Sequence, residues 1–316
     1  MDVPAPKKRI SIVTSCFNEA GNLDELYRRI HGVFSGLPRY EWEMVIADNR
    51  STDGSRDILR GLAAGDRRVK VVFNARNFGV IRSGHNALMR CSGDAAVLMC
   101  SDLQDPPEMI PAFIEAWERG NAVVCAVKAG RRGLSPMALA RSVYYRMLEA
   151  ISETPLLNDF YGFGLYSRSF LEALKRYREP YPYFRGLVGE IGLARAEIPF
   201  AQAKRGAGRS SYNFLSYYDT AMNGIVNHSR LPLRLAAFAG FLMAGGSLLV
   251  ALAYFVVKLM FWDRFSLGLA PIMIGLFFFS SVQLIFIGIL GEYLGAVWTQ
   301  VKDRPHVIEE EVLNFD

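Results

Sequence analysis

Residues 95–108 read AAVLMCSDLQDPPE, which is an apolar run, a polar turn and two prolines in succession. The run has the length of a buried strand, and Asp102 and Gln104 come directly after it. Pro106 and Pro107 then open a helical pattern, because proline fits the first turn of a helix. This stretch therefore predicts a strand, a polar loop and a helix in that order.

The same unit recurs through the first half of the chain. Other strand-like apolar runs cover residues 10–14, 42–47, 69–73 and 122–127. Helical patterns cover residues 22–34, 55–64, 80–90 and 107–119. Alternation of this kind predicts an α/β fold in which helices cover both faces of a mostly parallel sheet. Ligands of such sheets bind beyond the carboxyl ends of the strands.

Polar side chains gather at those strand ends. They are Asn18 and Glu19, Asp48, residues 74–77, Asp102 and Gln104, and, after the last run, Lys128, Arg131 and Arg132. Carboxylates on one side and cations on the other indicate a crevice for a nucleotide and its phosphates. The sequence has no Gly-x-Gly-x-x-Gly fingerprint and no Walker loop, which argues against dinucleotide oxidoreductases and phosphate-loop nucleotidases.

Composition favours phosphates or anionic lipid over nucleic acid as the binding partner. The 316 residues carry a net charge of +5, and they contain no repetitive Lys/Arg tract. Cys16, Cys100 and Cys125 lie in or beside apolar runs, as reduced core cysteines do, and show no metal-ligand spacing. Because the N-terminal residues also lack a secretory signal, we expect a reducing, cytoplasmic environment.

Two long uncharged runs follow the α/β pattern. Residues 235–257 and 265–291 contain no charged side chain, and each could cross about 30 Å of hydrocarbon as a helix. Their short connection predicts a hairpin with both ends on one side of a membrane, and glycines in both runs would allow close packing. A pair of buried core helices is the alternative. The cations that flank the hairpin are Arg230, Arg234, Lys302 and Arg304. The connection carries Lys258 and Arg264, offset by Asp263, so the charge count favours a cytoplasmic domain by a small margin.

Several motifs in order resemble one known family. Residues 15–22 (SCFNEAGN), 47–55 (ADNRSTDGS), 76–79 (RNFG) and 101–108 (SDLQDPPE) look like the motifs of family 2 glycosyltransferases. The resemblance is to the branch that transfers sugars to polyprenyl phosphates, such as dolichyl-phosphate mannose synthase and bactoprenol glucosyltransferases, and it spans nearly the whole chain. It implies a GT-A fold, a nucleotide-sugar donor, a polyprenyl phosphate acceptor and Mg²⁺ or Mn²⁺.

The resemblance also implies a division of the chain. We expect a GT-A catalytic domain (1–212), an amphipathic interfacial segment (213–234), two transmembrane helices (235–294, at about 235–257 and 266–291) and a cytoplasmic tail (295–316). The expected location is a bacterial inner membrane. The Gly-rich helices and the tail could join copies of the chain into a homo-oligomer, and no nucleic acid partner is expected.

By resemblance, Phe17, Glu19 and Asp48 contact the nucleoside of the donor, and Asp102 and Gln104 hold the metal. Oxygen ligands of this kind suit Mg²⁺ or Mn²⁺. Two other aspartates have simpler expected roles. Asp53 is expected in a turn and Asp105 at a helix start.

Residues 205–212 (RGAGRSSY) resemble the family segment that touches phosphate. Its place just before the membrane section favours binding of the acceptor phosphate over a solvated basic loop. The candidates for this contact are Lys128, Arg131, Arg132, Arg205 and Ser210.

Two departures from the family concern the chemistry directly. Cys100 stands where the family has the first aspartate of Asp-x-Asp, and Gly162 stands where it has a catalytic aspartate. Asp159 and Glu190 are the candidate replacements, so that they and Asp102 are the predicted catalytic residues. Loss of a base is tolerable, because the second pKa of a phosphate monoester is about 6 and much of the acceptor is already a dianion at neutral pH.

The leading hypothesis is a membrane-bound, inverting hexosyltransferase that moves one sugar from a nucleotide-sugar, UDP-linked, to undecaprenyl phosphate on the cytoplasmic face. The alternative is a catalytically degenerate family member that binds nucleotide or lipid as a subunit. A processive polysaccharide synthase ranks last, because the sequence has no Gln-x-x-Arg-Trp motif and no larger set of apolar helices.

Overall fold

The computed structural model describes residues 7–129, 157, 160–177, 179, 184–202, 222, 226, 229–261, 269–302 and 304–315. In this part of the chain, one eight-stranded sheet runs in the order β7-β5-β6-β4-β1-β2-β3-β8. The strands are β1 (Lys8–Cys16), β2 (Tyr40–Asp48), β3 (Val69–Asn74), β4 (Ala95–Leu98), β5 (Val123–Lys128), β6 (Gly164–Ser167), β7 (Arg195–Phe200) and β8 (Glu309–Leu313). Strands β6 and β8 run antiparallel to their neighbours, whereas the other pairs are parallel. The predicted mostly parallel α/β sheet is confirmed.

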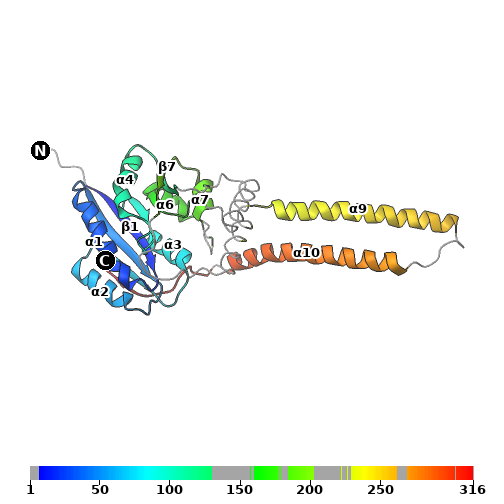
Figure 1. The fold of residues 1–316 in the computed structure, drawn as a ribbon, viewed down its shortest axis with the longest axis horizontal. Helices are drawn as coiled ribbons and strands as arrows, with labels where there is room; N and C mark the ends of the chain where they lie inside the picture. The colour runs from blue at the N-terminus through cyan, green and yellow to red at the C-terminus, as the bar shows by residue number, and fades with distance from the viewer. Residues whose placement is uncertain are drawn as a thin grey trace.

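Helices lie on both sides of the sheet (Figure 1). They are α1 (Ala20–Ser35), α2 (Ser55–Gly65), α3 (Val80–Arg90), the 3₁₀ helix η1 (Pro107–Met109), α4 (Ile110–Glu118), α6 (Arg168–Leu174) and α7 (Phe184–Ile191). Side chains of α1, α2 and α4 share one apolar cluster, and those of α3, α6 and α7 share another. The helical patterns predicted in the first half of the chain are all present.

The strand sequences account for these two clusters, because successive side chains of a strand point to opposite faces. In β1, Ile10 and Ile12 belong to the cluster with α1, whereas Val13 belongs to the cluster with α3. None of the three has any exposed surface. Helix α1 presents Leu23 and Leu26, one turn apart, to the first cluster, as an amphipathic helix does.

A buried carboxylate joins β1, β2, β3 and the loop after α3. Glu43 accepts hydrogen bonds from Ser11 Oγ at 2.6 Å and from Ser92 N and Oγ at 2.6 and 2.7 Å, and it pairs with Lys70 Nζ at 2.8 Å. Burial alone would raise the pKa of Glu43, but Lys70, Ser11 and Ser92 together lower it to about 2. The ionised form of Glu43 therefore stabilises the sheet.

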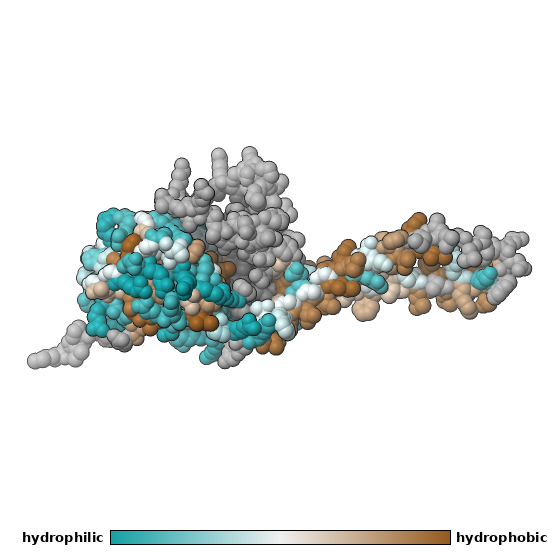
Figure 2. Space-filling view, turned by 90° about the horizontal axis from the view of Figure 1, so that it is seen from below, coloured by the Kyte–Doolittle hydropathy of each residue, from teal (hydrophilic) through white to brown (hydrophobic). Residues whose placement is uncertain are grey.

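Two long helices, α9 (Leu231–Met260) and α10 (Leu269–Val301), extend together away from the sheet (Figure 1). Leu231–Met260 and Ile274–Val301 are long and apolar enough to cross a membrane, and their apolar windows are 0% buried. Figure 2 shows apolar residues along both helices and mostly hydrophilic residues over the domain. Exposed apolar surface on this scale is unfavourable in water, and it makes the two helices candidate membrane spans.

The two helices contact each other at few points. A Cβ on Gly240 of α9 would lie 3.8 Å from Phe286 Cε2 of α10, while the other glycines of these helices have no such neighbour within 4 Å among the described residues. Tyr293 Oη donates to Ser229 O at 2.7 Å, which joins α10 to the residues that lead into α9. The expected glycine packing is therefore present at Gly240 only, as far as the structure describes these helices.

Beyond α10 the chain returns to the domain. Ile308 O accepts a hydrogen bond from Ala75 N at 2.9 Å, and β8 then pairs with β3. Asn314 Nδ2 donates to Ala63 O and to Val69 O, each at 2.8 Å. Part of the segment expected to be a tail is thus an edge strand of the sheet.

The expected division of the chain otherwise stays a prediction. Helix α9 contains the whole of the predicted span 235–257, and α10 begins within the predicted span 266–291. Most of the predicted interfacial segment, residues 213–234, lies outside the described residues.

We expect Glu43→Gln to lower the free energy of unfolding at pH 7 by roughly 3 kcal/mol, since the pKa of Glu43 falls from 4.5 to about 2 on folding. Because the pKa is depressed, this stability is present above pH 4.5 and is lost as the pH falls towards 2. The measurement is denaturant unfolding of the detergent-solubilised chain between pH 3 and 7.

Glu41→Gln on the same strand is the control for that prediction. Glu41 pairs with Arg9 at 2.9 Å, but both side chains are about half exposed. We therefore expect less than about 1 kcal/mol. Equal losses in the two variants would contradict the role given to Glu43.

Candidate active site

Two loops at the carboxyl ends of β1 and β2 are joined into one wall. Asn18 N donates to Ser51 Oγ at 2.9 Å, and Thr52 N donates to Asn18 Oδ1 at 2.8 Å. Asn18 has a φ of +58°, a conformation that asparagine adopts more readily than most residues. We call the joined loops, residues 17–19 and 49–54, the strand-end wall.

Asp53 fills the turn role that the sequence predicted for it. Its Oδ2 accepts from Ala20 N at 3.0 Å, and its Oδ1 accepts from Ser55 N at 3.1 Å and from Ser55 Oγ at 2.6 Å. Burial would raise the pKa of Asp53, but these hydrogen bonds lower it. Asp53 is therefore an ionised structural anchor of the strand-end wall.

The strand-end wall carries two of the residues predicted to contact the donor. Phe17 is 41% exposed, and an exposed ring of this kind can stack on a nucleobase. Glu19 is buried: its N donates to Ser55 Oγ at 3.0 Å, and its carboxylate accepts from Asn22 Nδ2. Phe17 thus faces outward, whereas Glu19 is part of the wall's internal hydrogen bonding.

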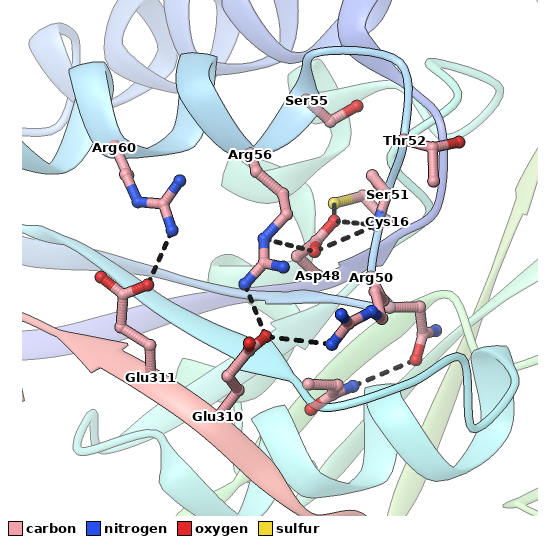
Figure 3. Close-up of polar contacts among 12 residues, drawn as sticks. Cys16, Asp48, Arg50, Ser51, Thr52, Ser55, Arg56, Arg60, Glu310 and Glu311 are labelled. Carbon is pink, nitrogen blue, oxygen red and sulfur yellow. Dashed lines mark hydrogen bonds and ion pairs between the residues drawn. The ribbon is translucent and has the colours of Figure 1, made fainter.

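Asp48, the third predicted donor residue, lies beneath the wall with no exposed surface. Its carboxylate accepts from Ser51 N at 3.2 Å and from Cys16 Sγ at 3.6 Å, and it lies 3.7 Å from Arg56 Nε (Figure 3). Burial raises the pKa of the Cys16 thiol well above its usual value, and Asp48 raises it further. Asp48 therefore orders the loop that contains Ser51.

Asp102 and Gln104 share the turn that follows β4. Gln104 N donates to Asp102 Oδ1 at 3.2 Å, and Gln202 Nε2 donates to Gln104 Oε1 at 3.3 Å. Leu103 between them has a φ of +61°. The side chains of both predicted metal ligands are partly exposed. The turn therefore presents two oxygen-bearing side chains side by side at the surface.

Asp105 has a larger part in the site than the helix start predicted for it. It has no exposed surface, and it accepts hydrogen bonds from Cys100 N at 2.8 Å and from Tyr161 Oη. Lys128 Nζ lies 4.4 Å from the centre of the Tyr161 ring. Burial raises the pKa of Asp105, although the hydrogen bonds from Tyr161 and Cys100 oppose this. These contacts join the turn after β4 to the ends of β5 and of the segment before β6.

Tyr161 was not among the predicted site residues, and Asp105 was predicted only to begin a helix. Two signals were available: Asp105 follows the metal-type motif directly, and Tyr161 precedes Gly162, where the chain departs from the family. The hydrogen bond between them spans 56 residues, which no local pattern reveals.

Cys100 does not replace the missing carboxylate. Burial raises the pKa of its thiol well above the usual value, and Asp105 and Asp102 raise it further. A neutral thiol is a poor ligand for Mg²⁺ or Mn²⁺, which prefer oxygen. This motif therefore offers a cation the carboxylate of Asp102 and the amide oxygen of Gln104.

That donor set suits a cation held jointly with a substrate. In the part of the chain that the structure describes, no group of three or more His, Cys, Asp or Glu side chains could hold a metal ion. Mg²⁺ is often bound through one or two carboxylates together with substrate phosphates, rather than by a complete protein cage. Asp102 and Gln104 fit this arrangement.

The backbone conformation at Gly162 would be strained in a residue that carries a side chain. Its φ is +116°, a conformation that L-residues rarely adopt, and an added Cβ would lie 3.6 Å from Leu98 Cδ2 and 3.8 Å from Phe184 Cδ1. Gly162 O also accepts from the buried Tyr166 Oη at 2.6 Å. The local backbone conformation is thus one that glycine adopts readily and that the family's aspartate would adopt only with strain.

The remaining predicted site residues divide into two groups. Glu190 is exposed near the C-terminal end of α7, and the contacts of the described residues do not link it to Asp102. Its catalytic role stays a prediction. The others lie outside the described residues: Asp159, Arg131, Arg132, Arg205 and Ser210.

A mostly parallel sheet with the Asp102–Gln104 turn and the exposed Phe17 ring at its strand ends is compatible with a glycosyltransferase. Residues 11–175 match Glycosyl transferase family 2, and the chain belongs to this family. Family membership and the sheet order together confirm the expected GT-A fold class.

Curated relatives match over almost the whole chain. An uncharacterized glycosyltransferase, YkcC of Bacillus subtilis, is 32% identical over 302 residues, which are 95% of this chain and 93% of the relative. The SfII prophage-derived bactoprenol glucosyl transferase of Shigella flexneri is 31% identical over 301 residues, which are 95% of this chain and 97% of the relative. The match therefore includes the long helices as well as the sheet.

Solved structures resemble the chain more distantly. The mannosyltransferase PcManGT of Pyrobaculum calidifontis, in complex with GDP-Man and Mn²⁺, is 16% identical, with a TM-score of 0.47 and coverage of 95% of this chain and 89% of that one. Glucosyl-3-phosphoglycerate synthase of Mycobacterium tuberculosis is 20% identical, with a TM-score of 0.44 and coverage of 69% and 76%.

Restoring the family's aspartate should fail in this backbone. We expect Gly162→Asp to lower the free energy of unfolding by about 1–3 kcal/mol, because the side chain would be forced into a positive-φ conformation, and to leave activity no higher than that of the unmodified chain. Denaturant unfolding and a transfer assay check the two parts. Gly61→Ala, in α2 with open space around the Cβ, should not destabilise. A stable and more active Gly162→Asp variant would contradict this account.

Proposed function

We propose that this glycosyltransferase moves one sugar from a UDP-sugar to undecaprenyl phosphate at the cytoplasmic face of a bacterial inner membrane. The observation that carries the proposal is the Asp102–Gln104 turn, which lies at the strand ends of a family 2 domain in a chain that also carries an apolar helix pair. The likeness to a bactoprenol glucosyl transferase over nearly its full length supports a polyprenyl phosphate acceptor.

The proposed reaction is a direct displacement. An oxygen of the acceptor phosphate attacks the anomeric carbon, the bond from that carbon to the nucleoside diphosphate oxygen breaks, and the diphosphate leaves with the bonding electrons. The configuration at the anomeric carbon is inverted. Because the second pKa of a phosphate monoester is about 6, the nucleophile is largely a dianion at neutral pH and needs no protein base. A glycine at position 162 is compatible with this chemistry.

The protein's contribution is then placement and charge. Phe17 would stack on the base, and Asp102 with Gln104 would hold Mg²⁺ or Mn²⁺, whose charge would stabilise the leaving diphosphate. Lys128, near Tyr161 and Asp105, would face the phosphates together with the predicted Arg131, Arg132, Arg205 and Ser210.

The helix pair would hold the domain at a fixed distance from the membrane surface, where the acceptor's phosphate lies. Arg230 and Arg234 stand at the start of α9, and Lys302 and Arg304 follow α10, at the end of the pair that adjoins the domain. Cations in this position favour an anionic headgroup layer and a cytoplasmic domain. The strand-end site would then lie beside the lipid phosphate.

A second candidate function is favoured by Cys100 and Gly162. A family member with one motif carboxylate and no aspartate at position 162 could bind nucleotide or lipid without turnover, as a subunit. Metal-dependent binding of UDP in calorimetry, with no lipid-linked sugar formed from any donor, would favour this function.

The test of the proposal is a transfer assay on the full chain in detergent or nanodiscs. Undecaprenyl phosphate is incubated with UDP-sugars or GDP-mannose and with Mg²⁺, Mn²⁺ or EDTA, and lipid-linked sugar is measured after extraction. We expect transfer from a UDP-sugar that EDTA abolishes. No product from any donor would overturn the proposal.

In the same assay, we expect Asp102→Asn to lower kcat/KM by about 100-fold or more and to raise the metal concentration needed for half-maximal rate. Asp57→Asn is the matched control, since the Asp57 side chain on α2 is 88% exposed and contacts only Arg60 among the described ion pairs. Its kcat/KM should stay within about twofold of the unmodified chain. Equal losses in both variants would argue against a metal role for Asp102.

A further inference from the structure

The strand that follows the membrane helices begins with three glutamates in succession, each of which meets a basic side chain of the domain. Glu309 pairs with Arg90 of α3. Glu310 Oε2 lies 2.9 Å from Arg56 Nη2, and Glu311 Oε2 lies 2.8 Å from Arg60 Nη2 (Figure 3). Strand β8 is thus held by charge as well as by backbone pairing.

A β-bulge directs Glu310 towards the site. Phe73 pairs with Glu311 and Asn74 pairs with Glu309, so Glu310 is the extra residue between two paired positions. In a regular strand, neighbouring side chains point to opposite faces, yet Glu310 and Glu311 both reach arginines of α2. Bulges re-aim side chains in this way and are common beside active sites.

Arg56 lies between Glu310 and Asp48. Its Nη2 donates to Glu310, while its Nε lies 3.7 Å from Asp48 Oδ2, and its guanidinium carbon lies 4.7 Å from the centre of the Phe73 ring. Nε is buried and makes no hydrogen bond within the described part of the chain. The guanidinium is therefore shared between an exposed glutamate and a completely buried aspartate.

A second connection runs from Glu310 to the loop after β2. Arg50 has a φ of +62°, and its Nη1 donates to Ala75 O at 2.7 Å and lies 3.4 Å from Glu310 Oε2. Ala75 N in turn donates to Ile308 O just before β8. The loops after β2 and β3 are both fastened to the start of the returning strand.

We propose that Glu310 is a positioning residue for the nucleoside end of the donor site, acting through Arg56 on Asp48 and the strand-end wall. The proposal rests on the proposed function. With Glu310 present, Arg56 Nε is held 3.7 Å from Asp48 Oδ2, about half an ångström beyond hydrogen-bonding distance. Without it, the attraction between Arg56 and Asp48 has no competitor, so the carboxylate turns towards Arg56 and away from Ser51 N. The wall that presents Phe17 then loses an anchor.

The experiment uses the full chain in nanodiscs and compares Glu310→Gln with Glu311→Gln. Glu311 is the matched control, because it is the next residue of the same strand and pairs with an arginine of the same helix, but not with Arg56. We expect Glu310→Gln to weaken UDP binding in calorimetry by about fivefold to tenfold and to raise the KM for the donor, while kcat changes less. Glu311→Gln should leave both values unchanged, and the two variants should have similar melting temperatures.

A double-mutant cycle identifies the path. If Glu310 acts through Arg56, adding Glu310→Gln to Arg56→Gln should weaken UDP binding no further. The inference is overturned if Glu310→Gln binds UDP as well as the unmodified chain does. It is equally overturned if Glu311→Gln weakens binding as much, or if the loss in Glu310→Gln follows a lower melting temperature.

A nucleotide-free measurement separates this inference from the proposed function. Amide hydrogen exchange over residues 49–54 should be faster in Glu310→Gln than in Glu311→Gln, because Ser51 N loses its anchor on Asp48. If the unmodified chain binds no nucleotide at all, the proposed function fails, and the exchange rates still decide whether Glu310 positions the wall. Equal exchange in the two variants would remove the positioning role itself.

Discussion

Strand β8 reaches β3 only after the chain has passed out along α9 and back along α10. A strand can pair only where its neighbour lies. The start of α9 and the end of α10 must therefore both lie close to the domain that contains the sheet. This one pairing therefore fixes the arrangement of the helix pair: the chain leaves the domain along α9 and returns to it along α10. The ion pairs of Glu309, Glu310 and Glu311 bind the returning chain to α2 and α3. The anchor is fastened to the sheet at two places rather than at one.

The strand-end carboxylates fall into two classes that differ in how many hydrogen bonds they accept from the domain. Asp48, Asp53 and Asp105 accept hydrogen bonds from backbone and side-chain donors of the domain, and they shape loops. Asp102 stands partly exposed on its turn with Gln104. With Cys100 neutral and residue 162 a glycine, this site holds less negative charge than the family pattern implies. Such a site repels a phosphate dianion less, which suits an acceptor that supplies its own charge.

The fold class was predictable because its signals are local. Apolar runs of strand length, helical spacing and polar strand ends all lie within short windows of sequence, and the structure places Asp102 and Gln104 together as their spacing predicts. The missed features depend on distant partners. Residues 309–313 read EEEVL, which shows no strand alternation. Glu309 and Glu310 contact Arg90 and Arg56, which lie 219 and 254 residues earlier in the sequence. The positive φ of Gly162 and the Tyr161–Asp105 contact are likewise set by packing between segments.

The position of β8 in the chain also orders events during biosynthesis. Asn314 donates a hydrogen bond to Ala63, which lies 251 residues earlier in the sequence. Both long helices lie between the two residues in the chain and are therefore synthesised before Asn314. Until those helices have left the ribosome, β3 has an open edge, which other chains could pair with. If the two helices insert into a membrane as proposed, their return brings the last strand back to that edge and removes the long search that such distant pairing would otherwise require. If donor binding depends on Glu310 as proposed, an uninserted chain is also an unfinished enzyme. The chain would then bind nucleotide-sugars only after it has reached the membrane that contains its lipid acceptor.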